Sequence, residues 1–503
     1  MYAHSMKSQA WLGIALVALG AGLAAPSQAK AGGYDTPMLY SARHMGMGGT
    51  AVSYVDDPSA LFHNPAGLSG TDRLTLMGDF SLLVGTITGN PATDNQNLTS
   101  NTTVGPFFLV GGSGRITDWL TVGLAVYPVA SAGATYEYDG GIDQTTLFFL
   151  EISPGVAVEI PDTGLSFGAG YRVTYASLDR SRDQGTAAAF DLSGLSYAGF
   201  RVGAQYKFLD HFSVGLAYRH KTTTDVEGQG FLFDSSAETE WVGSFTLPSR
   251  LSMGGRMDYG AFGVAVDAEY GLQSQNPRGQ LEEAGGRGVI DVTQISDWTN
   301  AWTVRLGAEY RLLEGKLPIR LGFIWDQQTS NRAYPTAFGT PPAPTYVATA
   351  GLGYNAGPWQ LNVAYAFRTG STTITAEDID GRDGCLSCGE AGEYSIKLSG
   401  IYVDFSYHFG RGETREGEGG VEYRSSGFVE PEPEVEPEPE VAPEPEPEPE
   451  VAQPQTAPAF GDMGTGPEGG AGSEPVEGGA GSEPVEGGGG SEPVEGQPGS
   501  PGF

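Results

Sequence analysis

Residues 301–312 read AWTVRLGAEYRL, in which apolar side chains alternate with polar or small ones. Trp302 and Leu306 share one parity, and Arg305 and Glu309 share the other. Because successive side chains of a β-strand point to opposite faces, this period of two predicts a strand with one apolar face. The sequence therefore predicts an all-β protein, since the same alternation recurs at 165–175, 200–208, 212–219, 262–270 and 358–368.

The number of such segments separates two all-β architectures. A soluble sandwich needs only about seven to nine strands. The count here reaches about fourteen, an even number, as in bacterial single-chain outer-membrane barrels. We therefore expect a transmembrane antiparallel β-barrel over residues 72–409. Its expected strands are 72–86, 104–116, 119–130, 146–160, 164–178, 193–208, 212–224, 249–259, 261–273, 299–312, 317–327, 345–356, 358–369 and 394–409.

The connections between these strands alternate in length. Turns such as Thr117-Asp118 and Gly260 are short, and a much longer connection follows each. Short periplasmic turns and long outer loops are typical of outer-membrane barrels. This asymmetry predicts that the N-terminal segment and the C-terminal tail both lie in the periplasm. The expected long connections are 87–103, 131–145, 179–192, 225–248, 274–298, 328–344 and 370–393.

The composition agrees with a barrel. The 503 residues include 77 Gly and 46 Phe plus Tyr, which suits strands better than helices. Past the N-terminus there is no run of about 18 apolar residues that could form a membrane-spanning helix. Barrel strands place apolar residues in alternate positions, so the slightly polar mean hydropathy is compatible with a membrane protein.

The N-terminus carries an export signal. Lys7 precedes the apolar run 11–25, and Ser27-Gln28-Ala29 supplies a small-x-small cleavage site. We expect a signal peptide over residues 1–29, with cleavage after Ala31 as the alternative. Export and a barrel together predict the outer membrane of a Gram-negative bacterium, with membrane lipids around a monomer.

The C-terminal region 410–503 differs in composition from the rest. It holds 21 Glu and one Asp against three Arg, a net charge of −19 out of −34. A Pro-Glu run at 430–450 and Gly/Ser-rich repeats at 468–495 cannot bury enough surface to fold, so we expect a disordered acidic periplasmic tail. The tail is either a solvated tether or a spacer that meets a periplasmic partner. Nucleic acid is excluded as a partner because no basic patch exists to neutralise phosphates.

Residues 45–68, MGMGGTAVSYVDDPSALFHNPAGL, precede the strands and lack their alternation. Glycines give this segment conformational freedom, and Asp and Asn beside proline favour turns. We therefore expect a compact N-terminal plug, or hatch, over residues 30–71 ahead of the barrel. Its candidate gate residues are Gly46, Gly48, Gly49, Asp56, Asp57, Asn64, Pro65 and Ala66.

No pattern in the sequence predicts catalysis or a cofactor. The six His residues are scattered, and no pair has the spacing of metal ligands. His44 and His63 with the two aspartates of the plug could be read as a metal cluster, but polar packing inside a lumen is the simpler interpretation. Cys385 and Cys388, in a long outer connection, are candidates for a small disulfide.

Irregularities are expected at three places in the wall. Pro154 predicts a local bulge because proline cannot donate to the ladder. Pro128, next to Tyr127 late in the third strand, predicts lost pairing and a candidate lateral opening. In the last strand the apolar parity changes between Leu398 and Ile401, which predicts a bulge near Ser399-Gly400.

Several motifs resemble the FadL/TodX-type outer-membrane transporters of long-chain fatty acids and other hydrophobic compounds. The resemblance covers roughly residues 32–409. It implies a hatch that blocks the lumen, a gate at the candidate residues above, and a kink in the third strand that opens the wall. It lies in the glycine cluster 46–49, in Asp56-Asp57-Pro58-Ser59-Ala60 and Asn64-Pro65-Ala66, and in 247–250, 317–322, 351–354 and 392–394 with the final Ser406-Tyr407-His408-Phe409.

The function implied is passive uptake of hydrophobic small molecules, with no enzymatic activity. The connection at 179–192 is shorter than the helical capture loop of the fatty-acid members, which leaves the substrate open. Two other functions fit a barrel: a general diffusion porin, and a structural protein tethered through its acidic tail. A membrane-embedded hydrolase is a more distant alternative.

Overall fold

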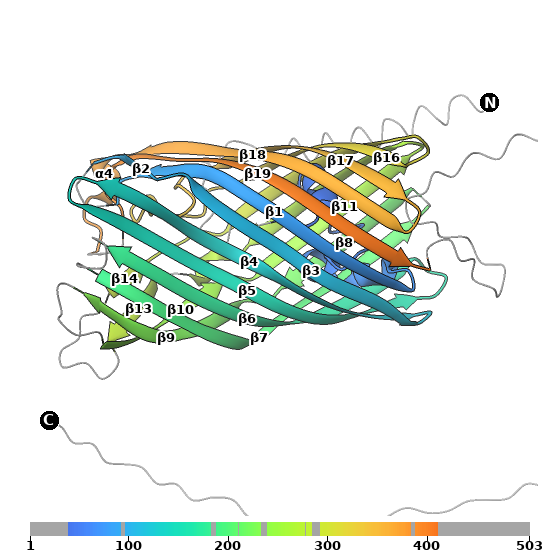
Figure 1. The fold of residues 1–503 in the computed structure, drawn as a ribbon, viewed down its shortest axis with the longest axis horizontal. Helices are drawn as coiled ribbons and strands as arrows, with labels where there is room; N and C mark the ends of the chain where they lie inside the picture. The colour runs from blue at the N-terminus through green and yellow to red at the C-terminus, as the bar shows by residue number, and fades with distance from the viewer. Residues whose placement is uncertain are drawn as a thin grey trace, which may run out of the picture. The chain divides into compact units, whose positions relative to one another are not determined.

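The chain folds into a closed antiparallel β-barrel that encloses its own N-terminal segment (Figure 1). The computed structural model describes residues 39–91, 96–182, 188–209, 211–232, 239–276, 278–283, 292–383 and 388–410. The predicted signal peptide and acidic tail lie outside the described residues. Unless stated otherwise, the following paragraphs concern these ranges alone.

The helices are short and lie before, between or after the strands. They are α2 (Ala42–Gly46), α3 (Ala60–His63) and α4 (Ala376–Ile379), with the 3-10 helices η2 (Pro65–Gly70) and η4 (Gln273–Gln275). The strands are β1 (Leu74–Gly89), β2 (Leu98–Thr99), β3 (Thr103–Thr117), β4 (Leu120–Tyr138), β5 (Gly141–Ile160), β6 (Leu165–Arg182), β7 (Ala188–Phe208), β8 (Phe212–Arg219), β9 (Thr222–Leu232), β10 (Thr239–Leu247), β11 (Arg250–Tyr259), β12 (Phe262–Gly271), β13 (Arg278–Glu283), β14 (Val292–Ile295), β15 (Ala301–Leu312), β16 (Leu317–Asp326), β17 (Thr345–Ala356), β18 (Trp359–Ile374) and β19 (Gly392–Phe409).

Fourteen strands form the wall, as the alternation predicted. Four of them are each divided into two segments, namely β8 with β9, β10 with β11, β12 with β13, and β14 with β15. The strand β2 is an additional short one beside the end of β1. The wall closes where β1 pairs with β19, from Leu74 opposite Phe409 to Thr88 opposite Ser395.

The two faces of the wall have the predicted polarity. In β15, Trp302 and Leu306 are 40% and 46% exposed, whereas Arg305 and Glu309 are 3% and 5% exposed. The apolar face therefore points outward, as a lipid-facing barrel requires. No helix within the described ranges is long and apolar enough to cross a membrane.

Three of the predicted long outer connections are largely strand. Strands β4 and β5 continue to a tight turn at Asp139-Gly140, and β6 and β7 extend to Arg182 and from Ala188. The predicted connection 225–248 contains most of β9 and all of β10. These extensions carry outward polar residues such as Thr223 and Glu227, so the apolar alternation that marks a lipid-facing strand is missing from them.

The predicted bulge near Ser399-Gly400 is wrong. Strand β19 pairs with β1 and with β18 without a register shift. Tyr394 and Ile396 face the interior, whereas Ile401 and Phe405 face outward. The apolar parity changes because the interior itself becomes apolar toward the long-loop end, and not because the strand bends.

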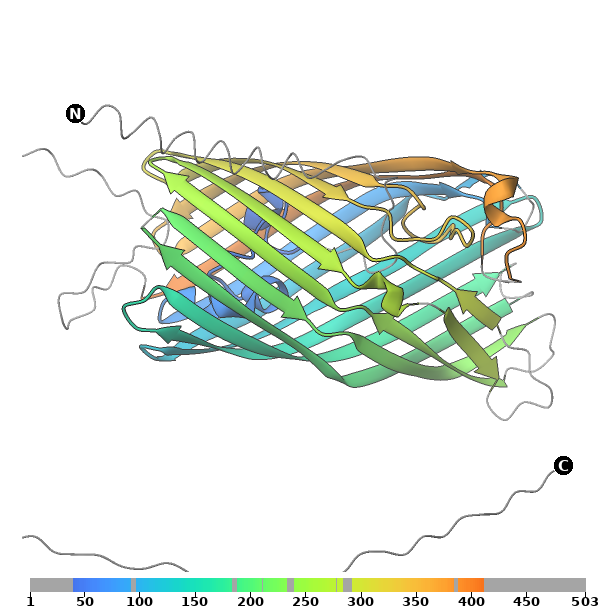
Figure 2. The same cartoon turned by 180° about the vertical axis from the view of Figure 1, so that it is seen from behind.

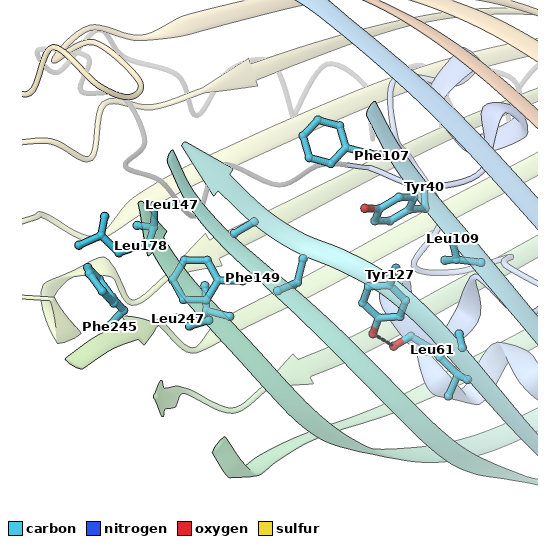
Figure 3. Packing of buried hydrophobic residues seen from close by; sticks show 14 of the residues in the cluster. Tyr40, Leu61, Phe107, Leu109, Tyr127, Leu147, Phe149, Leu178, Phe245 and Leu247 are labelled. Atoms are coloured by element: carbon cyan, nitrogen blue, oxygen red, sulfur yellow. Dashed lines mark hydrogen bonds between the residues drawn. The ribbon is translucent and has the colours of Figure 1, made fainter. Parts of the chain in front are cut away.

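An apolar cluster fills the interior at the long-loop end of β3 to β10. Figure 3 shows Phe149, Leu147, Leu178, Phe245 and Leu247 in one group, with Phe107, Leu109 and Tyr127 nearer the N-terminal segment. The rings of Phe149 and Phe245 are 6.3 Å apart, and those of Phe190 and Trp241 are 5.0 Å apart. Side chains from non-neighbouring strands therefore meet across this part of the interior.

Candidate transport site

Residues 39–71, which we call the inner segment, lie inside the barrel. Figure 2 shows their helices enclosed by strands at the end where the short turns lie. Helix α2 contacts β16 to β19, and η2 contacts β4 to β7, so the segment contacts two separate groups of wall strands. Most of its residues are buried, including the whole stretch 44–55.

Glycines of the inner segment lie directly against glycines of the wall. The Cα of Gly46 is 2.8 Å from where a Cβ on Gly351 would sit. A Cβ on Gly322 would overlap the backbone nitrogen of Gly48. Gly48 and Gly49 have φ values of 67° and 74°, which side chains disfavour. This side of the segment is held by backbone-to-backbone contact.

The same arrangement continues around the wall. A Cβ on Gly168 would overlap the peptide between Pro65 and Ala66, and a Cβ on Gly215 would overlap the carbonyl of Val52. We call the inward-facing wall glycines 168, 203, 215, 307, 322 and 351 the glycine seat.

Asn64 joins the inner segment to the wall and to itself. It is fully buried, and its Nδ2 donates to the carbonyls of Val52 at 2.7 Å and of Ala204 in β7 at 3.0 Å. Its Oδ1 accepts from the backbone N–H of Ala66 at 3.2 Å and caps η2, where Pro65 is the first residue. Proline suits this position because the N–H it lacks has no helical partner there.

Two aspartates of the segment have different roles. Asp56 pairs with Arg43, with Oδ1 2.6 Å from Nη1. Asp57 accepts from the backbone N–H of Ser59 at 2.8 Å, and burial raises the pKa of its carboxyl to about 6. Both aspartates are thus structural parts of the segment.

The two histidines of the segment lie in surroundings that favour the neutral imidazole, with His44 fully buried and His63 partly buried. Burial lowers the pKa of His63 to about 4 and that of His44 well below its usual range. His63 Nε2 donates to the carbonyl of Tyr40 at 2.9 Å, and His44 Nδ1 donates to that of Thr50 at 3.0 Å. Within the described ranges, no three His, Cys, Asp or Glu side chains are grouped so as to hold a metal ion.

Wall carboxylates hold backbone N–H groups of the inner segment. Asp267 of β12 accepts from Ala51 at 2.8 Å and from Val52 at 3.1 Å. Asp404 of β19 accepts from the N–H of Arg43 at 3.0 Å and from the hydroxyl of Ser41 at 2.8 Å. The sequence reasoning missed these anchors, although both are acidic residues on the inward parity of their strands.

Pairing between β3 and β4 stops at Val110 opposite Val126. Beyond this point β4 pairs with β5 alone, and its register with β5 shifts between Pro128 and Ala130. The break predicted at Pro128 is therefore present. Pairing of β5 with β6 skips Ser153 and Pro154, but the register is the same on both sides of these residues, so the interruption is a gap in the pairing and not the bulge predicted at the second proline.

The inner segment contacts the wall where β4 leaves β3. Tyr40 donates a hydrogen bond from its hydroxyl to the carbonyl of Pro128, and Tyr127 donates to the carbonyl of Leu61 at 3.1 Å. Phe62 packs between the two tyrosine rings, with centroids 5.2 Å from Tyr40 and 5.4 Å from Tyr127. Tyr40, Leu61 and Phe62 of the inner segment, which are not among the candidate gate residues, are thus in direct contact with the candidate lateral opening.

A cavity lies on the long-loop side of the inner segment. Four arginines and Glu269 are the charged residues that the barrel wall contributes to its lining, and most of the other lining residues are apolar. The lining residues are Leu39, Gly49, Val52, Phe62, His63, Val129, Arg201, Ala217, Arg219, Arg250, Ser252, Glu269 and Arg305.

Cys388 is buried and disulfide-bonded. Cys385 lies outside the described residues, so its pairing stays a prediction.

The wall, its polarity and the enclosed segment define a class of protein, an outer-membrane β-barrel channel. The sequence matches the family model described as outer membrane protein transport protein (OMPP1/FadL/TodX) over residues 22–409. The chain belongs to this family, whose members are monomeric transport channels for hydrophobic molecules and not enzymes. It is therefore a protein of the Gram-negative outer membrane.

Solved structures of the family share the fold. A FadL homologue of Pseudomonas aeruginosa has a TM-score of 0.63 at 17% identity, over 75% of this chain and 100% of that one. The Pseudomonas putida toluene transporter TodX gives 0.58 at 19% identity, over 74% and 98%. The Ralstonia pickettii toluene transporter TbuX gives 0.56 at 16% identity, over 74% and 98%. No curated protein matches the sequence closely enough to count as a relative.

Proposed function

We propose that the chain is a passive uptake channel in which the inner segment plugs the lumen and the substrate leaves sideways between β3 and β4. One observation carries this proposal. The wall loses its pairing at Val110–Val126, beside the apolar cluster and at the level where the inner segment closes the lumen. A molecule from the long-loop side thus meets an obstructed lumen and a neighbouring gap in the ladder.

The proposed substrate is a small hydrophobic molecule. Phe107, Leu109 and Val129 line the inner side of the gap and are almost fully buried. Apolar side chains can be exchanged for an apolar solute at little cost, because neither is hydrated there. Toluene is the substrate named for two structural relatives, so it is the first compound to test.

We place the short turns, the inner segment and the C-terminal tail in the periplasm. The support is the unequal length of the connections, which is typical of outer-membrane barrels. In this orientation the apolar cluster lies toward the cell surface and the inner segment toward the periplasm. The tail itself stays a predicted solvated tether.

The test is uptake of labelled toluene and of a labelled long-chain fatty acid by cells that express the chain. We expect uptake of at least one to exceed that of cells without the barrel, and to fall when Asn64-Pro65-Ala66 is replaced by Ala-Gly-Gly. Equal uptake with and without the barrel would contradict the proposal. Sustained ion conductance of the unaltered barrel at neutral pH in planar bilayers would favour the general porin instead.

A further inference from the structure

The ladder is interrupted along a continuous line that crosses eight neighbouring wall strands, from β4 to β15. On β4 the interruption is the register shift at Pro128–Ala130. On the other strands it falls at 153–154 of β5, 171–173 of β6, 194–200 of β7, 220–221 between β8 and β9, 248–249 between β10 and β11, 272–276 after β12, and 296–300 between β14 and β15. We call this line the seam.

On β5, β6 and β7 the seam consists of missing and shifted pairs. The β5–β6 ladder lacks the pairs between Ile152–Val173 and Gly155–Gly170 with its register unchanged, and the β6–β7 register shifts between Arg172 and Thr174. The residues of β7 from 194 to 200 form no ladder pair with β8 or β9. Each interruption adjoins the next, so the seam is one feature of the wall.

From β8 to β15, side-chain hydrogen bonds supplement the backbone bonds that remain, such as that from the N–H of Leu272 to the carbonyl of Ser249 at 2.9 Å. The Ser249 hydroxyl accepts from the N–H of Lys221 at 3.0 Å, and the N–H of Ser249 donates to the Gln275 amide oxygen at 2.8 Å. The N–H of Ser274 donates to the Asn300 amide oxygen at 3.0 Å. Figure 2 shows the short helix at 273–275 that interrupts the wall here. Such bonds satisfy the backbone without fixing it as a ladder does, since the side chains can rotate.

Beyond the seam the strands form a second sheet, which we call the upper lobe. It consists of β9, β10, β13 and β14 with the long-loop ends of β4 to β7. Its two edges lack continuous wall partners. On one side β4 has left β3 after Val126, and on the other β14 pairs with β13 alone within the described ranges.

The upper lobe holds the long-loop part of the apolar cluster, which continues through Phe107, Leu109 and Tyr127 to the inner segment. Phe149 of β5 meets Phe245 of β10, and Phe190 of β7 meets Trp241 of β10, both edge-to-face. Figure 3 shows the Phe149–Phe245 group at the far end of the cluster from Leu61. Aromatic packing of this kind favours one arrangement of the strands over others. These contacts between non-neighbouring strands hold the strands of the lobe together.

We propose that the upper lobe tilts as a unit about the seam, and that this tilt widens and narrows the gap between β3 and β4. A line of broken pairing that runs from one free edge of a sheet to the other is where a hinge costs least, because few ladder bonds must change. The structure shows the lobe closed. Its edge is tied by the N–H of Asn101 to the carbonyl of Thr135 at 2.8 Å, and the hydroxyl of Tyr136 binds the carbonyl of Ala337.

A reversible disulfide tests the hinge. A Cβ on Gly339 would lie 4.0 Å from that of Ala132, within the range for a disulfide. The Ala132→Cys, Gly339→Cys pair would fasten the lobe to the loop between β16 and β17. The control pair is Thr223→Cys, Thr246→Cys, whose native hydroxyl oxygens are 2.9 Å apart and both lie within the lobe.

We expect the oxidised Ala132–Gly339 pair to lower substrate uptake at least about tenfold, with recovery on reduction. The oxidised control pair should leave uptake unchanged, and the unaltered chain with and without reductant corrects for the native disulfide. Unchanged uptake in the fastened variant, with the disulfide confirmed by mass spectrometry, would overturn the hinge.

A second measurement separates the hinge from the proposed function, on which the uptake readout rests. Spin labels at Glu227→Cys on the lobe and Thr373→Cys on β18, both exposed, report the distance between lobe and barrel. We expect a broad distance distribution, against a narrow one for labels at Glu227→Cys and Glu137→Cys within the lobe. Equally narrow distributions would show that the lobe does not move, whatever the channel transports.

Discussion

The hydroxyl of Tyr40 donates a hydrogen bond to the carbonyl of Pro128, 88 positions further along the chain. Pro128 is where β4 has lost its partner on the β3 side and shifts its register with β5. A residue of the inner segment therefore takes part in holding an edge of the wall that no neighbouring strand holds.

Removing the Tyr40 hydroxyl should loosen this edge. Tyr40→Phe keeps the ring contacts with Phe62 and Tyr127 but leaves the Pro128 carbonyl without its donor, at a cost of about 1 kcal/mol. We expect uptake of the hydrophobic substrate to rise several-fold. Tyr54→Phe is the control, since the Tyr54 hydroxyl donates to Thr50 within the inner segment. Equal uptake by both variants would argue against a role for the Tyr40 contact.

Asn64 should be essential for the packing of the inner segment. Asn64→Ala removes the hydrogen bonds that its amide donates to the carbonyls of Val52 and Ala204, and leaves the Gln205 amide as the donor to Val52, at a cost of about 2 kcal/mol. We expect faster hydrogen exchange across residues 45–68. Asn355→Ala is the matched control. The Asn355 side-chain amide also donates to a backbone carbonyl, that of Gly315 at 2.8 Å, but this bond joins two short turns and does not involve the inner segment. Slow exchange in the Asn64 variant would refute this anchoring role.

A side chain in the glycine seat should displace the inner segment without unfolding the barrel. In Gly322→Val the new side chain would occupy the position of the Gly48 backbone. We expect stable ion conductance in planar bilayers and a folded barrel by circular dichroism. Gly78→Ala is the control, since a Cβ at Gly78 has no atom within 4 Å. A non-conducting, folded Gly322 variant would show that the segment does not close the lumen.

Acid should loosen the inner segment through its histidines. Their lowered pKa values mean that the packed segment loses stability as the pH falls from about 6.5, the usual histidine value, toward about 4, the pKa of His63. Asp57 opposes this, because a carboxyl pKa raised to about 6 favours the packed state at low pH and loses that contribution as the pH rises through 6. The loss of the histidine contribution is the effect expected on acidification.

The measurement is conductance in planar bilayers at pH 7 and pH 4.5. We expect more frequent openings at the lower pH. His63→Gln, which can still donate to the Tyr40 carbonyl, should reduce this dependence, and Asp57→Asn should make it steeper. A dependence unaffected by either substitution would assign it to other groups.

Much of the wall could be predicted from the sequence. Trp302 and Arg305 differ in parity, and a lipid-facing barrel requires that one face the bilayer and the other the interior. The interruptions at Pro128 and Pro154 were predictable as well, because proline cannot donate to a ladder. These features depend on local chemistry, which neighbouring residues reveal.

Features beyond the bilayer and between distant residues could not be predicted in this way. Thr223 and Glu227 lie on the outward face of β9 in a part of the wall that needs no apolar surface, so the signal for a strand is absent. Gly48 and Gly322 are in contact although they lie 274 residues apart in the chain. A glycine in the sequence does not indicate which residue will pack against it. The seam is hidden for the same reason, since most of its breaks are defined by partner strands.

The glycine seat has a consequence for biogenesis. The wall glycines lie so close to the backbone of the inner segment that a closed barrel has no room to admit residues 39–71. The barrel closes where the first strand, β1, pairs with the last, β19, and Asp404 of β19 accepts hydrogen bonds from Ser41 and Arg43 of the segment. We therefore expect β1 and β19 to pair only after the inner segment has taken its place inside the barrel. Residues 72–410 refolded alone should therefore conduct ions, and should continue to do so when a synthetic peptide of residues 39–71 is added afterwards. The barrel should not conduct when the peptide is present from the start of refolding.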